Sequence, residues 1–243
     1  RVNRNTTAPP RSVPEVSTLP AYGVDVYPGS NFVHWPDISA PGAWNVVAPR
    51  PEYFFAGDFR LGDFSKLWVL NSSTNQLATI DTTTGAVTVI GSAVPSGGQS
   101  WTGLTAAIDG TLYASSVACG TSSTLYTVDP STGATTVVGT ITNAPCIIDI
   151  AATPAGKIYG VDIVNDNLVE INPTTGAGTV IGPLGINANY AQGMDYDELA
   201  GELLWAAYNG GTSQGELRVI DTTTGASTLI GAFPGGAEVG AFG

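Results

Sequence analysis

Alternating apolar and polar positions run through most of the chain and predict β-strands rather than helices. The clearest of them form four nearly identical segments. Each segment has an apolar strand end, a polar turn closed by Thr-Gly, and a second strand of alternating Thr, Val and Ile. The segments span residues 80–91, 128–139, 171–182 and 220–231. Glycine supplies the positive φ that a tight turn of this kind needs, so we predict four β-hairpins.

A fainter fifth copy of the same hairpin stands near the start of the chain, at residues 31–35 and 41–47. The unit recurs about every 45 residues, with turn glycines at Gly42, Gly85, Gly133, Gly176 and Gly225. Another apolar strand precedes each hairpin, at residues 21–26, 67–70, 111–114, 158–163 and 203–206. The chain is therefore built from five similar β units.

A further strand completes four of the units, at residues 54–57, 101–105, 147–151 and 192–195. The first unit has a proline-rich stretch at that place, and the matching strand appears at residues 238–242 instead. Four antiparallel strands per unit and one displaced strand predict an all-β five-bladed β-propeller, whose C-terminal strand joins the N-terminal blade and closes the ring. We expect residues 21–243 to form this domain and residues 1–20 to be an extended Pro/Thr-rich tail or linker.

The repeated unit Leu-Tyr-x-x-Asp-x-x-Thr-Gly-x-x-Thr-x-Ile-Gly resembles the repeats of secreted bacterial propellers of the YVTN and quinoprotein-like group. It also looks like the propeller modules of extracellular proteins, including some subtilisin-like peptidases. The resemblance covers residues 21–243. It implies a propeller and a secreted protein that is often part of something larger. It transfers no functional residue, because the matching positions specify the fold.

Charge limits the partners of the chain. Eight Lys and Arg stand against twenty Asp and Glu, for a formal net charge of −12, and three of the eight are Arg1, Arg4 and Arg11. A chain this acidic cannot displace counterions from nucleic acid, which excludes a nucleic-acid binder. No apolar run approaches the roughly 18 residues of a membrane helix, so we expect no membrane insertion. The low charge content and abundant Thr, Ser and Gly favour a secreted protein, extracellular or on the cell surface.

The two cysteines, Cys119 and Cys146, fall in neighbouring predicted blades and on the same face of the ring. We expect a disulfide, because secretion favours oxidation, provided that the two Cα atoms come within about 7 Å. The alternative is that both are small buried hydrophobic side chains.

Ligands of a propeller usually bind on the face that holds the loops between blades and the loops between second and third strands. Candidates at this face are Trp101, Asp149, Tyr190, Gln192 and Glu238. The two aromatic residues can stack on a sugar or a partner's side chain, or they pack in the core. A carboxylate pair about 6.5–9.5 Å apart at the channel mouth would suit glycan hydrolysis. The carboxylates expected nearest that mouth are Asp58, Asp149 and Glu238.

Acidic residues form two further groups. One shares a face of a single blade and has the oxygen ligands that Ca²⁺ prefers, and it comprises Asp149, Asp162 and Asp166. The alternative is that these side chains hydrogen-bond their own turns. The other lies on a predicted hairpin at the opposite face, so it cannot join the first group, and it comprises Asp195, Asp197 and Glu198.

We therefore expect a secreted, non-catalytic propeller that acts as a structural or protein-interaction module. Residues 1–20 would contact protein neighbours or other copies of the chain in an extracellular assembly. Two alternatives stay open: a carbohydrate-binding or glycan-hydrolysing propeller, and an accessory domain of a secreted peptidase. We expect no cofactor, apart from Ca²⁺ at the first acidic group.

Overall fold

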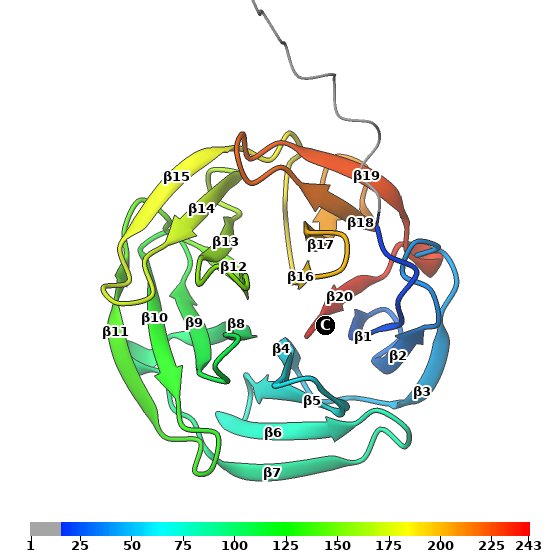
Figure 1. The fold of residues 1–243 in the computed structure, drawn as a ribbon, viewed down its shortest axis with the longest axis horizontal. Coiled ribbons are helices and arrows are strands. Elements are labelled where there is room, and N and C mark those ends of the chain that lie inside the picture. Colours follow the sequence, from blue (N-terminus) through cyan, green and yellow to red (C-terminus); the bar gives the residue numbers. More distant parts are fainter. Residues whose placement is uncertain (1–15) are drawn as a thin grey trace, which may run out of the picture.

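The computed structural model describes residues 16–243, which form five four-stranded antiparallel sheets arranged as the blades of a ring (Figure 1). Blade 1 consists of β20 (Glu238–Gly240), β1 (Ala21–Tyr27), β2 (Asn31–Trp35) and β3 (Asn45–Pro49). Blade 2 consists of β4 (Phe54–Arg60), β5 (Asp63–Asn71), β6 (Gln76–Asp81) and β7 (Val87–Ser92).

Blade 3 consists of β8 (Ser100–Ala106), β9 (Leu112–Ala118), β10 (Ser122–Val128) and β11 (Thr135–Ile141). Blade 4 consists of β12 (Ile147–Ala152), β13 (Ile158–Asp162), β14 (Asn167–Ile171) and β15 (Gly178–Pro183). Blade 5 consists of β16 (Gly193–Asp197), β17 (Glu202–Asn209), β18 (Gln214–Ile220) and β19 (Ser227–Ala232). Short 3₁₀ turns precede β8 and β20, at Ser96–Gly98 and Pro234–Gly236.

The predicted five-bladed propeller and its closure are confirmed. The C-terminal strand β20 pairs antiparallel with β1, with Val24 opposite Gly240. Beyond that strand, Gly243 and Tyr22 exchange two backbone hydrogen bonds of 2.7 and 3.0 Å. The two ends of the domain therefore hold the first blade together, and the ring has no free inner edge at the point of closure.

The hydrophobic core is divided into five clusters, and each lies between two neighbouring blades. The cluster between blades 5 and 1, for example, joins Trp35 to Leu204 and Phe233, and the cluster between blades 4 and 5 joins Tyr159 to Trp205. The other three lie between blades 1 and 2, 2 and 3, and 3 and 4. Each blade is thus stabilised by burial against its neighbours rather than within itself.

The two glycines of the repeated unit meet between neighbouring blades. Gly139 in β11 faces the turn of blade 4 so closely that an added Cβ would overlap the carbonyl oxygen of Thr175, and a Cβ on Gly176 would lie 2.7 Å from the backbone of Gly139. Gly91 and Gly182 meet the turns of their next blades in the same way. One residue before each of these glycines, the outer strand bulges out of register with its partner strand.

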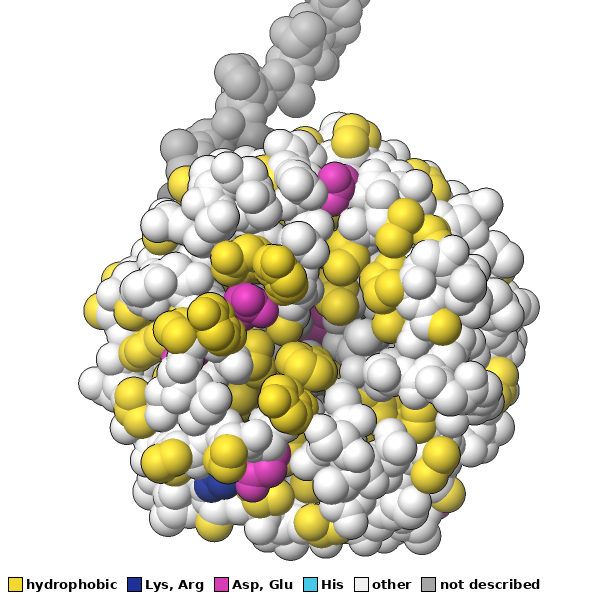
Figure 2. Space-filling view, turned by 180° about the vertical axis from the view of Figure 1, so that it is seen from behind, with side chains coloured by type: hydrophobic (Ala, Val, Ile, Leu, Met, Phe, Trp, Pro, Cys, Tyr) yellow, Lys and Arg dark blue, Asp and Glu magenta, His cyan; other side chains and the backbone are white. Residues whose placement is uncertain are grey.

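The ring has two faces that differ in the connections they carry. The turn face, as we call it, holds the hairpin turns between the first and second strands of the blades, at residues 60–63, 106–112, 152–158 and 197–202. The loop face holds the connections between blades and the turns between second and third strands. Seen from behind the view of Figure 1, hydrophobic side chains gather around the centre of the ring with acidic ones among them (Figure 2).

Replacement of the outer-strand glycine tests the contact between blades. We expect Gly139→Ala to lower the free energy of unfolding by about 3 kcal/mol, because the added methyl group forces the turn of blade 4 away. The control is Gly42→Ala, whose Cβ would lie 3.5 Å from the Ala232 carbonyl oxygen in ordinary contact, and which should change stability by less than about 0.5 kcal/mol. Urea unfolding followed by tryptophan fluorescence measures both. Equal effects would contradict this account of the repeat.

Candidate functional site

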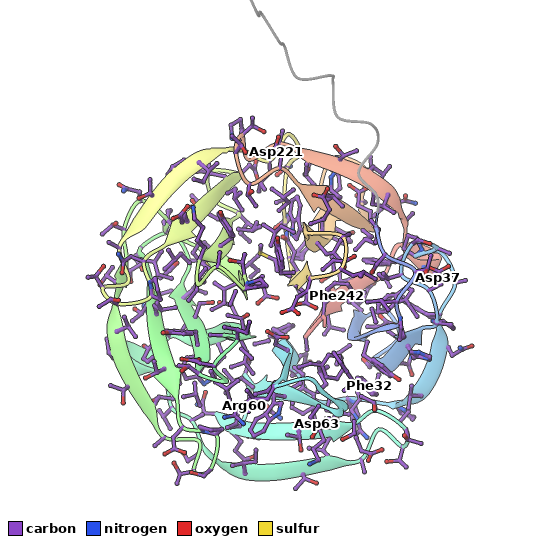
Figure 3. The ribbon with its side chains drawn as sticks, in the orientation of Figure 1. Phe32, Asp37, Arg60, Asp63, Asp221 and Phe242 are labelled. Atoms are coloured by element: carbon purple, nitrogen blue, oxygen red, sulfur yellow. A yellow bond between two sulfur atoms is a disulfide. The ribbon has the colours of Figure 1, made fainter. Side chains whose placement is uncertain are left out.

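A pocket of about 730 Å³ opens on the turn face, at the mouth of the central channel. Turns of blades 2, 3 and 5 form its rim. Four of the rim side chains are large, apolar and between 61% and 73% exposed, namely Leu61, Phe64, Ile108 and Leu199. The wall also includes Leu19 and Pro20 from the segment before β1, and Phe242, which lies near the centre of the ring (Figure 3). Exposed apolar side chains gathered around a cavity mark a binding surface.

The floor of the pocket is acidic, and Asp58 is its most constrained member. The Asp58 carboxylate, on β4, accepts hydrogen bonds from the Thr105 hydroxyl (2.9 Å) and the Ala106 N–H (2.7 Å) on β8. Burial raises the pKa of Asp58 from 3.8 to about 7, although these hydrogen bonds act in the opposite direction. Asp58 therefore ties blade 2 to blade 3.

Asp149 also connects two neighbouring blades, deeper in the channel. It is fully buried on β12, and its two oxygens accept the N–H groups of Ile150 and Met194, both at 2.8 Å. Met194 belongs to β16, so this carboxylate ties blade 4 to blade 5. Between these two ties, the Thr105 hydroxyl oxygen accepts the Ala152 N–H at 2.8 Å and links blade 3 to blade 4. Burial raises the pKa of Asp149 well above its ordinary value.

The carboxylates of the β16–β17 hairpin complete the floor. Asp195 accepts the N–H of Tyr196 at 2.7 Å, and its pKa is raised well above the ordinary value by burial and by the neighbouring charges of Asp58, Asp197 and Glu198. Asp197 holds its own turn and also accepts the Ser17 N–H at 2.9 Å. Glu198 is exposed at the rim.

The sequence placed this hairpin on the face opposite the first acidic group but did not identify the pocket around it. The sequence contained one short-range indication of the pocket. Leucine or isoleucine stands within the first hairpin turn of three blades, at Leu61, Ile108 and Leu199, where polar residues are usual. The pattern could not show that these turns surround one cavity.

The five residues expected at the loop face do not form one site, and none of them lines the pocket of the turn face. Trp101 is a correction: it lies within β8, fully buried, and its indole N–H donates to the Ala93 carbonyl, so it packs in the core and cannot stack on a ligand. Gln192 is also fully buried, where its amide oxygen accepts the Trp205 indole N–H at 2.7 Å. Asp149 is occupied in the tie between blades described above.

Two of the five remain near solvent. Tyr190 is 57% exposed and meets the Tyr208 ring edge-on at 5.2 Å. Glu238 begins β20, and partial burial raises its pKa while an N–H group of Ala191 counteracts the shift. The carboxylates proposed for hydrolysis are thus divided, because Asp58 and Asp149 serve as structural ties and Glu238 does not line the pocket.

The acidic residues considered for Ca²⁺ hydrogen-bond to nearby backbone. Asp162 accepts the N–H groups of Cys146 and Val164 and the side-chain amide of Asn165. Asp166 accepts the Ala188 N–H at 2.8 Å. Within residues 16–243, no three His, Cys, Asp or Glu side chains gather in a way that could hold a metal ion. The turn-forming alternative accounts for Asp162, whereas Asp166 holds the connection between blades 4 and 5.

The predicted disulfide is confirmed. Cys119, in the turn between β9 and β10, is bonded to Cys146, which directly precedes β12, and their Cα atoms lie 4.5 Å apart. The bond joins blades 3 and 4 at the loop face and is consistent with an oxidising extracellular or periplasmic location. In the part of the chain that the structure describes, no helix is long and apolar enough to cross a membrane.

Comparison with known proteins identifies the repeat and the fold. The family described as "Repeat of unknown function (DUF6923)" matches residues 47–198, more than half of the chain. No curated protein sequence matches. Similar solved structures are the calcium-binding protein regucalcin from Agrobacterium tumefaciens (18% identity, TM-score 0.56, 89% of this chain and 70% of that one) and a virginiamycin B lyase from Staphylococcus aureus (13%, 0.51, 83% and 62%).

A chain of the nidogen/laminin complex is similar as well (9% identity, TM-score 0.57, 92% of this chain and 96% of that one). The present chain spans less than two thirds of the virginiamycin B lyase. At such low identities these likenesses show the fold alone, since one fold carries many functions.

Removal of the disulfide tests its role in joining blades 3 and 4. We expect the double variant Cys119→Ala/Cys146→Ala to lose about 3 kcal/mol of stability, because the unfolded chain is no longer constrained over the 27 residues between the cysteines. Urea unfolding with and without a reducing agent measures this. Reduction should destabilise the unmodified protein and leave the double variant unchanged, and any response of the variant would contradict the assignment.

The raised pKa of Asp58 predicts a pH dependence of stability. Because its folded pKa of about 7 exceeds the ordinary 3.8, the folded state holds a proton that the unfolded chain releases between these values, so stability falls as the pH rises through this range. Asp58→Asn keeps an oxygen acceptor for Thr105 and should reduce the fall in Tm between about pH 5 and 8. Part of the decrease in Tm should remain in this variant, because the pKa values of Asp149 and Asp195 are also raised.

The matched control is Asp129→Asn, since Asn172 already occupies the equivalent turn position in blade 4. The pKa of Asp129 is lowered by hydrogen bonds from Ser131 and Thr132, so its contribution is lost only when the pH falls below its unfolded pKa of about 4. Between pH 5 and 8 the Tm of this variant should decrease with pH as much as that of the unmodified protein. An unchanged slope in Asp58→Asn would overturn the assignment.

Proposed function

We propose that this chain, which belongs to the family of DUF6923 repeats, is a non-catalytic propeller that binds a protein partner at the pocket of its turn face. The observation that carries the proposal is the rim, where four large apolar side chains stand more than half exposed around one cavity. Apolar rims of this kind are buried when a partner docks.

The state of the channel carboxylates supports a binding rather than a catalytic role. A general acid or nucleophile must reach the reacting atoms of its substrate. Asp58 and Asp149 instead accept two hydrogen bonds each, including backbone N–H groups of the next blade. Freeing either one for chemistry would break a tie between blades.

Secretion and assembly are part of the proposal. The disulfide, the low charge content and the resemblance of the repeats to secreted YVTN-type propellers support export. Assembly through residues 1–20 is supported by the contacts of Ser17, Leu19 and Pro20 with the pocket. Residues 1–15 of that tail lie outside the described residues. The role of an accessory domain in a secreted peptidase stays a prediction.

A second candidate function, carbohydrate binding at the loop face, rests on Tyr190. This ring is exposed and is held in place by its edge contact with Tyr208. A rigid exposed aromatic ring can stack on the apolar face of a sugar. Loss of glycan binding in Tyr190→Ala, beside unchanged binding in a pocket variant, would assign this function.

Peptide selection tests the proposed docking surface. Random peptides displayed on phage and selected against the full-length protein should yield binders whose affinity drops at least about tenfold in Phe64→Ser/Leu199→Ser. The control, Tyr27→Ser/Val94→Ser, removes two apolar side chains that are also more than half exposed but do not line the pocket, and it should leave binding unchanged. Binders that ignore the pocket variant, or that are lost with the control, would overturn the proposal.

A further inference from the structure

We infer that the pocket receives the arginine-bearing N-terminal segment, residues 1–11, of a second copy of this chain, so that the propellers join head to tail. The inference rests on the proposed function, that the turn face binds protein, and it names the partner. Three observations carry it: the acidic side chains of the pocket, the position of three arginines in the sequence, and the course of the described chain past the pocket.

The pocket gathers four acidic side chains, and no Lys or Arg among the described residues lines it. Its floor and rim hold Asp58, Asp195, Asp197 and Glu198. The described Lys and Arg are engaged elsewhere, in the ion pairs Arg50–Glu52, Lys66–Asp63, Lys157–Glu170 and Arg218–Glu216. The remaining one, Arg60, donates to the Gly110 carbonyl at 2.6 Å and lies over the Trp68 ring.

The rest of the chain contains the complementary charge. Arg1, Arg4 and Arg11 stand in the first eleven residues, and Glu15 is the single acidic residue before position 16. Arginine suits this pocket because its aliphatic stem can lie along the apolar rim while the guanidinium pairs with carboxylates below. Charge complementarity therefore points to this segment as the occupant.

The course of the chain favours the segment of a second copy over the chain's own. The Ser17 N–H is bonded to Asp197, and the Leu19 carbonyl accepts the Ile38 N–H at 3.0 Å, so residues 17–20 form part of the pocket wall. From this wall the described chain leads away from the centre of the ring (Figure 1), and Val16 packs against the cluster between blades 5 and 1.

Arg11 precedes Ser17 by six residues in the sequence. Pro14 stands between them, and its fixed φ and missing N–H disfavour the tight return that would bring Arg11 back to its own pocket. A segment from another molecule needs no such return. Because donor segment and receiving pocket are different surfaces, the contact is heterologous and produces chains or rings of propellers rather than a closed symmetric dimer.

Two full-length variants test the inference. The tail variant is Arg1→Gln/Arg4→Gln/Arg11→Gln, and the pocket variant is Asp195→Asn/Glu198→Gln. Sedimentation velocity should show that the unmodified protein self-associates and dissociates as salt rises from about 0.05 to 0.5 M. Each variant alone should associate at least about tenfold more weakly. A thermal unfolding curve for each variant confirms that it is folded.

The decisive sample is the mixture of the two variants. The tail variant keeps an intact pocket and the pocket variant keeps an intact tail, so the mixture should form a 1:1 dimer that grows no further. The control variants Lys66→Gln/Lys157→Gln and Asp81→Asn/Asp129→Asn remove charges that do not line the pocket and should associate like the unmodified protein.

Three results would overturn the inference: a monomeric unmodified protein, association that persists in the tail variant, and a mixture that stays monomeric although both variants are folded. None of them affects the proposed docking surface, since the peptide selection examines binding at the rim separately. Peptides that bind the pocket beside a monomeric full-length protein would therefore leave the proposed function standing and remove the second copy as its partner.

Discussion

The backbone contact between neighbouring blades governs the geometry of this ring. In three successive blades, the outer-strand glycine touches the turn glycine of the next blade, as Gly139 touches Gly176, with no room for a Cβ. A bulge before that glycine bends the outer strand toward the turn. Close approach at the circumference lets the facing strands bury one hydrophobic cluster between each pair of blades. A bulkier residue at these positions would push the blades apart and open that core.

The close contact between blades at the circumference also determines the hydrogen bonds along the central channel. The inner strands come near enough for Asp58 and Asp149 to accept N–H groups from the following blade. These hydrogen bonds replace the water that the carboxylates lose, but they leave both pKa values raised, because burial outweighs them. The channel therefore holds carboxyl groups whose ionisation opposes folding and whose hydrogen bonds fix the register between neighbouring blades.

The two faces of the ring consequently differ in what they offer a partner. On the loop face, Trp101 and Gln192 turn inward and the disulfide fixes the connection between blades 3 and 4. On the turn face, short hairpins carry apolar side chains such as Phe64 and Leu199 outward around an acidic floor. Similar folds occur in a calcium-binding protein, a lyase and a chain of a nidogen/laminin complex, so the activity of this one must be sought in such local features.

The sequence by itself determined the number of blades, the four-strand unit, the exchange of the closing strand and the pairing of Cys119 with Cys146. The strand features follow from short-range patterns, since strand alternation acts within a few residues in all five units and a Thr-Gly turn closes four of them. The cysteine pairing follows from the places of the two residues in neighbouring units. Only the tertiary structure decided that Trp101 is buried and that Leu61, Ile108 and Leu199 surround one cavity with Asp195. Strand alternation shows from which face of its sheet a side chain projects. Whether that face meets protein or solvent depends on blades distant in sequence, which only the closed ring brings together.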